Sequence, residues 1–204
     1  MSINIQEIIP LTIQGEGYHV GMPCSFIRLF GCPVGCNFCD TGYAFGSNLP
    51  GYTKLSFDEI TDQLQSKNLV ITGGEPCINP EFTKLVDFLL SHGYRINVET
   101  SGIKSLDLLD NIWVTLSPKE HLTDNGKLDR SILKKINELK LVISSLTDFN
   151  YYQNIIYWCR LKDIPVYLQP EWSKKDEVLN LVIELANKHN LKVSSQVHKL
   201  IGVR

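Results

Sequence analysis

The sequence predicts an α/β fold built as an open, partial (β/α)6 barrel. Short segments typical of strands alternate with helical patterns from about residue 24 to the end. Six strand-and-crossover units of roughly 30 residues each fit the length of the chain. A closed barrel of eight units typically needs about 250 residues and does not fit. We therefore expect a single domain over residues 1–204, with its functional site at the carboxyl ends of the strands.

Six segments are expected to form the strands. Each is short, mostly apolar on both faces and bounded by Gly, Ser, Thr or Pro, which is typical of buried parallel strands. Their ranges are 24–30, 69–72, 96–99, 112–116, 139–143 and 165–168.

Helical patterns fill several of the gaps between these segments. Ser56 followed by Glu59 predicts a capping box that opens a helix ending at about residue 65. Pro80 opens a second helix, and Gly93 lies just after its end. Three more helices are expected near 131–138, 148–161 and 174–189, whereas 40–55 and 117–129 are expected to be loops.

The charge balance gives no reason to expect a nucleic acid or an anionic membrane as a partner. Lys and Arg number 20 and Asp and Glu number 22. No apolar stretch approaches the roughly eighteen residues of a membrane span, and the first residues do not have the pattern of a secretory signal. We therefore expect a cytoplasmic protein.

The cysteines divide into a tight cluster and three scattered residues. Cys32, Cys36 and Cys39 fall in the loop after the first predicted strand, and in a reducing cytosol such a cluster favours metal or redox chemistry over disulfides. Three thiolates at this spacing can hold three corners of an iron–sulfur cubane and leave one iron open to a second ligand. A structural zinc with His19 or His198 as fourth ligand is the alternative. The scattered residues, Cys24, Cys77 and Cys159, are expected in the core.

Two elements together resemble the radical S-adenosylmethionine (SAM) enzymes. The first is the three-cysteine loop with Phe38 before its third cysteine, and the second is Thr72-Gly73-Gly74-Glu75-Pro76 at the end of the next strand. Glycines there let the backbone approach a ligand closely, and Glu75 can fix the turn. The resemblance implies a [4Fe–4S] cluster on Cys32, Cys36 and Cys39 and SAM as the second cofactor. It also implies that the Gly-Gly-Glu-Pro element holds the amino group of SAM.

Further motifs resemble one branch of that family, which contracts 6-carboxy-5,6,7,8-tetrahydropterin to 7-carboxy-7-deazaguanine in queuosine precursor biosynthesis. The motifs are Gln14-Gly15-Glu16-Gly17, Arg28, Asp40-Thr41, Ser117-Pro118-Lys119, Gln169-Pro170 and Gln196-Val197-His198-Lys199. The resemblance runs from about residue 5 to residue 204. It further implies a pterin substrate, a flavodoxin- or ferredoxin-type reductant and a homodimer.

The same resemblance implies a role for each site residue. Glu99 and Arg28 are the expected catalytic residues, and Arg28 offers a bidentate cation to the substrate carboxylate. Substrate contacts are expected from Ile13, Gln14, Gly15, Arg28, Thr72, His198 and Arg204. SAM contacts are expected from Phe38, Cys39, Asp40, Gly74, Ser117, Pro118, Lys119, Gln169 and Pro170. The Thr41 hydroxyl is the expected protein ligand of a Mg²⁺ ion.

Three of these assignments also have a purely structural interpretation. Arg28 is also explained as a strand residue that extends its charge to solvent, Asp40-Thr41 as a simple Asx turn, and Glu99 as half of a salt bridge. For the whole chain, one alternative is an activating enzyme for a glycyl-radical protein, which shares the three-cysteine loop. The other is a non-catalytic zinc-binding adaptor.

Overall fold

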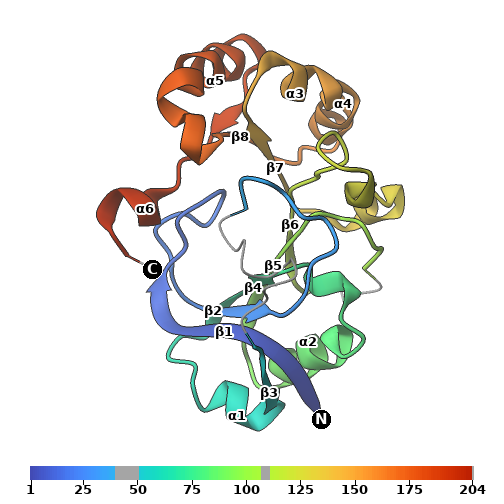
Figure 1. Cartoon of the computed structure of the whole chain (residues 1–204), viewed down its shortest axis with the longest axis vertical. Coiled ribbons are helices and arrows are strands. Elements are labelled where there is room, and N and C mark those ends of the chain that lie inside the picture. Colours follow the sequence, from blue (N-terminus) through green and yellow to red (C-terminus); the bar gives the residue numbers. More distant parts are fainter. Residues whose placement is uncertain (40–50, 107–110, 204) are drawn as a thin grey trace.

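The computed structural model describes residues 1–39, 51–106 and 111–203. Within these residues nine strands form one sheet in the order β3-β1-β2-β4-β5-β6-β7-β8-β9. Figure 1 shows the sheet curving around a central space, with α2, α3, α4 and α5 on its outer side. The open, partial barrel predicted from the sequence is therefore confirmed.

The six predicted strands are confirmed, and they pair in parallel in chain order. They are β2 (Pro23–Leu29), β4 (Asn68–Gly73), β5 (Arg95–Thr100), β6 (Trp113–Leu116), β7 (Glu138–Ile143) and β8 (Val166–Pro170). Because the carboxyl ends of parallel strands meet at one edge, the loops that carry the predicted motifs gather there.

Three strands lie outside the predicted set: β1 (Ser2–Ile13), β3 (Thr53–Ser56) and β9 (Lys192–Val193). β1 pairs antiparallel with both β2 and β3. Its register with β2 shifts between Ile9 and Thr12, around Pro10, which has no N–H to donate to a ladder. Residues 40–55 were expected to form a loop, but in their described part β3 begins at Thr53. Pairing with β1 outweighs the weak local preference of these residues for a strand.

The helices differ from the expectation in four places. The capping box of Ser56 and Glu59 is present, but α1 (Phe57–Thr61) ends before residue 65. Segment 131–138 forms a 3₁₀ helix over Arg130–Lys135. Segment 148–161 divides at buried Tyr152 into α3 (Leu146–Tyr151) and α4 (Gln153–Leu161), and α6 (Val197–Ile201) was not predicted. The other two are α2 (Phe82–Ser91) and α5 (Lys175–His189).

The two faces of the parallel strands differ in chemistry. Outer-face residues such as Val98, Leu116, Leu139 and Leu141 form the main hydrophobic core with the helices. On β2 and β4 the inner face is also apolar, as expected, with Cys24, Phe26 and Val70 in a second buried cluster. On β5, β6, β7 and β8 the inner face instead carries polar and charged side chains, which corrects the expectation for those strands. These inner residues include Asn97, Thr115, Glu138, Lys140 and Gln169, all of them buried.

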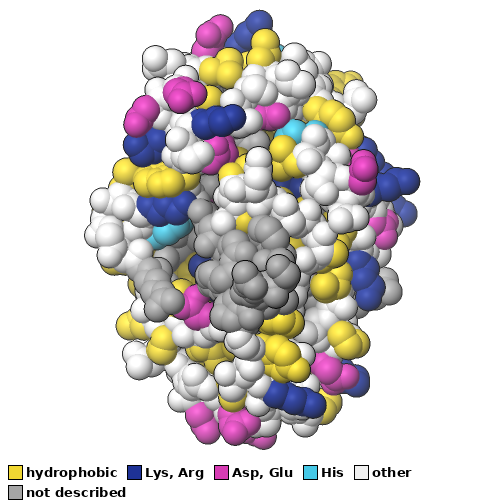
Figure 2. Space-filling model, viewed as in Figure 1, with side chains coloured by type: hydrophobic (Ala, Val, Ile, Leu, Met, Phe, Trp, Pro, Cys, Tyr) yellow, Lys and Arg dark blue, Asp and Glu magenta, His cyan; other side chains and the backbone are white. Residues whose placement is uncertain are grey.

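The surface agrees with the charge balance of the sequence. On the face seen in Figure 2, the described acidic and basic side chains are interspersed among neutral and apolar ones. None of the helices in the described ranges has the length and apolar character needed to cross a membrane.

Candidate functional site

One cavity of about 220 Å³ lies at the carboxyl ends of the parallel strands. Predicted site residues from both ends of the chain and from five of the six strand ends line it. Those that line it are Ile13, Gln14, Arg28, Cys32, Cys36, Phe38, Cys39, Thr72, Gly74, Glu99, Ser117, Lys119, Gln169, Pro170 and His198. Gly15 and Pro118 are described but do not line it. Asp40, Thr41 and Arg204 lie outside the described residues, so their roles stay predictions.

The three-cysteine loop follows β2 and forms one wall of the cavity. All three thiols are free and partly exposed, and the loop turns at Gly31 and Gly35, both with positive φ. Burial raises the pKa of the Cys32 and Cys36 thiols in the metal-free protein, and bound metal deprotonates such a group. In the described ranges no three His, Cys, Asp or Glu side chains form a ready-made site for one metal ion.

The Gly-Gly-Glu-Pro element is hydrogen-bonded to the start of that loop. The Gly74 N–H donates to the Leu29 carbonyl at 2.8 Å, and the Glu75 N–H donates to the Gly31 carbonyl at the same distance. A Cβ on Gly74 would lie 1.8 Å from the Gly31 oxygen, so only glycine allows this approach.

The Glu75 side chain fixes this turn from inside, as the sequence predicted. Its buried carboxylate accepts hydrogen bonds from the Thr100 hydroxyl at 2.6 Å and from the backbone N–H of Ser101 at 2.8 Å. It also accepts from the Cys77 N–H at 3.2 Å. Cys24, Cys77 and Cys159 are buried, which confirms the expectation that they are core residues.

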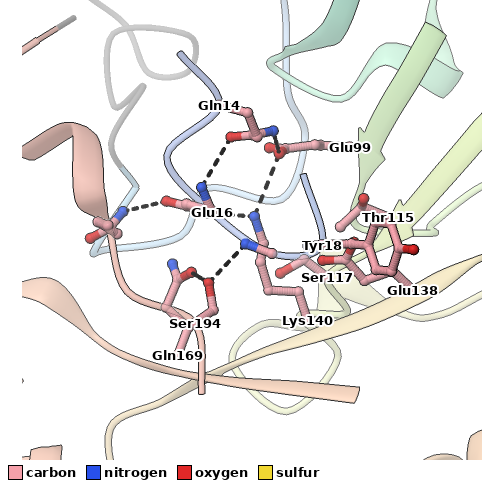
Figure 3. A network of polar contacts seen from close by, with 12 residues as sticks. Gln14, Glu16, Tyr18, Glu99, Thr115, Ser117, Glu138, Lys140, Gln169 and Ser194 are labelled. Carbon is pink, nitrogen blue, oxygen red and sulfur yellow. Dashed lines mark hydrogen bonds and ion pairs between the residues drawn. The ribbon is translucent and has the colours of Figure 1, made fainter. Parts of the chain in front are cut away.

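The opposite wall of the cavity is a polar network centred on Lys140, shown in Figure 3. The Lys140 ammonium contacts the Glu16 carboxylate and lies 3.6 Å from Glu99 Oε1. Gln14 Nε2 donates to Glu99 Oε1 at 3.0 Å, and Gln196 Nε2 donates to Glu16 Oε1 at 2.7 Å. The wall therefore joins side chains from the loop after β1, from β5, from β7 and from the segment before α6.

Two further cations line the cavity. Arg28 forms an ion pair through Nε with Glu7 of β1, at 3.3 Å. Lys119 Nζ donates to the Ser117 carbonyl at 2.7 Å and to its hydroxyl at 2.5 Å. Burial lowers the pKa of Lys119 to about 8, against the opposing effect of the Cys36 thiol.

The loop after β1 and the start of α6 meet beside this wall. The Val197 N–H donates to the Gly15 carbonyl at 3.0 Å, and a Cβ on Gly15 would lie 2.0 Å from Nδ1 of His198. Of the two histidines considered for zinc, His198 lines the cavity, whereas His19 packs edge-on against Trp113.

Comparisons with known proteins agree with this geometry. The radical SAM superfamily model matches residues 26–145. The 7-carboxy-7-deazaguanine synthase of Buchnera aphidicola is 34% identical, with 98% of each chain covered, and that of Escherichia coli K12 is 32% identical over 94% of this chain and 95% of the relative. The crystal structure of QueE from Escherichia coli superposes with a TM-score of 0.81 at 31% identity, covering 97% of this chain and 95% of that one.

The chain belongs to the 7-carboxy-7-deazaguanine synthase family, within the radical SAM superfamily.

A radical SAM enzyme of this family uses a [4Fe–4S] cluster and SAM, together with a small-molecule substrate and a reductant. These relatives do not favour the glycyl-radical alternative or the zinc adaptor. The described residues fit the cluster and SAM, because the three cysteines, none of them in a disulfide, and Gly74 of the Gly-Gly-Glu-Pro element line one cavity.

Lys140 is the residue of this family site that sequence reasoning missed. It lies within a predicted strand whose other residues are apolar, so it was assigned to the strand and given no role. A lysine in a buried strand is rarely stable without a carboxylate partner. That requirement indicates that Lys140 pairs with an acidic residue elsewhere in the chain. Glu16 and Gln196 were noted within motifs but were also given no role of their own.

Proposed function

We propose that this chain contracts 6-carboxy-5,6,7,8-tetrahydropterin to 7-carboxy-7-deazaguanine, with release of ammonia, in the biosynthesis of queuosine precursors. The family relatives support the reaction over nearly the whole chain. The observation that supports it best is that the three cysteines and the polar wall of Gln14 and Glu99 line one cavity. A ligand held at the polar wall therefore faces the cysteine loop.

Cys32, Cys36 and Cys39 are the proposed cluster ligands. A cluster held by these thiolates would supply the one-electron chemistry for reductive cleavage of bound SAM. The protein positions the reactants and excludes water. We assign the amino end of SAM to the open backbone at Gly74, and its remaining parts to Phe38, Ser117-Pro118-Lys119 and Gln169-Pro170. The hydrogen bonds from Lys119 to Ser117 support this grouping because they hold both residues at the same edge of the cavity.

The substrate is assigned to the polar wall. Arg28 supplies a guanidinium for its carboxylate, and the ion pair with Glu7 through Nε fixes the plane of that group. The pyrimidine edge of a pterin presents N–H donors, and Glu99 is the proposed acceptor for them. Ile13, Gln14 and Gly15 are assigned to the same edge from the resemblance alone. Thr72 and His198 complete the contacts, with Arg204 proposed from the resemblance alone.

Three further assignments also rest on the resemblance. Thr41, assisted by Asp40, is the proposed protein ligand of Mg²⁺, an ion that commonly takes few protein ligands and keeps several waters. A flavodoxin or ferredoxin is the proposed electron donor, and a homodimer is the proposed assembly.

The test is an anaerobic reaction of the iron-loaded protein with SAM, dithionite and 6-carboxy-5,6,7,8-tetrahydropterin. We expect a product lighter than the substrate by one ammonia, identified by mass spectrometry and absent when SAM is omitted. A protein that cleaves SAM but leaves the pterin intact contradicts the proposed substrate.

A further inference from the structure

Lys140 is a cation fixed inside the barrel by the strand that carries it. It lies on the inner face of β7 and is 4% exposed, whereas its neighbours Leu139 and Leu141 pack into the outer core. Those two leucines anchor the backbone on both sides, so the direction of the lysine is set by the pleat of the strand. The strand therefore sets the position of the ammonium, and the acidic side chains that pair with it come from other elements.

Two carboxylates approach that point from separate elements, and both line the cavity. Glu16 comes from the loop after β1 and contacts Lys140 directly, and Glu99 comes from β5 at 3.6 Å. Amide side chains orient each carboxylate further, because Gln196 donates to Glu16 and Gln14 donates to Glu99.

The cation decides which form of Glu16 is present. Burial raises the pKa of a carboxyl group, and a protonated carboxyl donates a hydrogen bond where an ionised one only accepts. For Glu16 burial acts in that direction, but the charge and hydrogen bond of Lys140 outweigh it and lower the pKa to about 2. The same contact raises the pKa of Lys140 against the effect of its own burial.

Other charged groups also face this cluster. Glu138, two residues earlier on β7, and Glu99 act on Lys140, whereas Lys119 and His198 act on Glu16. Among the cations, Lys140 contacts Glu16 directly and also forms an ion pair with Glu99. Its removal is therefore expected to leave two half-buried carboxylates in the lining of one cavity without the cation that pairs with both.

We propose that Lys140 is a positioning residue, which holds the carboxylates of Glu16 and Glu99 in place as hydrogen-bond acceptors in the lining of the cavity and so selects ligands with an N–H-rich edge. The inference deepens the proposed function and rests on it for the identity of the ligand. Lys140 acts through the two carboxylates, which are the groups that face the ligand.

The first experiment measures pterin affinity by anaerobic calorimetry between pH 6 and pH 9, on iron-loaded, SAM-bound protein without reductant. Wild type is the reference at each pH, because Lys119, which lines the cavity and has a pKa lowered to about 8, also titrates in this range. Lys140→Met is expected to bind at least about tenfold more weakly at pH 6, because ionised acceptors are lost, and to recover as the pH rises. Recovery at high pH separates this role from a structural defect, and Lys140→Arg, which keeps the charge, is expected to retain part of the affinity at pH 6.

Lys84→Met is the matched control, since Lys84 forms an exposed ion pair with Glu81 on α2 and its affinity profile is expected to follow wild type. If Lys140→Met does not fold, the double variant Glu16→Gln/Lys140→Met removes one charge of each sign and tests Glu99 alone. Unchanged affinity at pH 6 in either Lys140 variant overturns the inference.

A second readout needs no ligand. When the pH is lowered from 9 to 6, infrared spectra of Lys140→Met are expected to gain a protonated carboxyl band that wild type does not gain. The band is expected to be weaker in the double variant Glu16→Gln/Lys140→Met. If this band appears but no protein binds the pterin, the proposed function fails and the role of Lys140 stands. If the band is missing, the inference is wrong whatever the ligand.

Discussion

Leu141 and Lys140 are neighbours on β7 and are almost equally buried, at 1% and 4% exposed, yet they face opposite environments. Leu141 packs among aliphatic side chains between the sheet and the helices, where shape and volume determine the stability. Lys140 lies among carboxylates and amides that line a cavity, where each polar atom needs a partner. Depth of burial therefore does not separate structural from functional residues here, whereas the face of the strand does.

The largest effect is expected from a substitution in the cysteine loop, which lines the cavity. Cys36→Ala removes one of three thiolate ligands, so bound iron and SAM cleavage should both be abolished. Cys159→Ala is the control on the structural side, since Cys159 is fully buried in the outer core and away from the cavity. Its iron content is expected to stay near wild type. Full iron occupancy in Cys36→Ala contradicts the assignment of the cluster.

The second-largest effect is expected at Leu141, on the outer face of β7. Leu141→Ala leaves a cavity in the outer core, and the free energy of unfolding in urea should fall by about 2–5 kcal/mol. Iron content and SAM cleavage of the folded fraction should stay near wild type because Leu141 does not line the cavity. Leu179→Ala on α5, at an exposed position, should change the unfolding free energy by less than about 0.5 kcal/mol. Comparable losses in the two variants would show that the outer core is not the main source of stability.

The smallest effect is expected at the edge of the structural side, where α1 begins. Ser56→Ala removes the acceptor for the Glu59 N–H, a hydrogen bond of 3.3 Å, and should lower the free energy of unfolding by about 1 kcal/mol. The measurement is the urea midpoint at pH 7, and pterin turnover should not change. An unchanged midpoint would show that β3 and α1 do not depend on this cap.

Local patterns were sufficient for the parallel strands and for the cysteine loop. Val70 and Leu141 lie in short apolar runs, and the Cys32–Cys39 spacing has few chemical uses, so the strands and the loop could be predicted without knowledge of contacts. β1 could not be predicted in this way. Pro10 interrupts its pattern, and the strand forms because two neighbours pair with it across a shift in register.

The candidate site divides in the same way. Residues inside motifs were predicted together, and most of those described line one cavity. Lys140 was missed because its role arises from Glu16 and Glu99, which are 124 and 41 residues away in the chain and which no local pattern connects to it. The ion pair of Arg28 with Glu7 is a cross-strand contact and was likewise not visible in the sequence.

The contact between the loop after β1 and the segment before α6 has a consequence for synthesis on the ribosome. Glu16 and Gln196 are 180 residues apart, and the Gly15 carbonyl receives its hydrogen bond from Val197. At about 5–20 residues per second, a growing chain exposes its cysteine loop many seconds before the segment that closes the polar wall has emerged. A nascent chain therefore has the proposed cluster ligands but an incomplete polar wall until the segment around Gln196 has been translated.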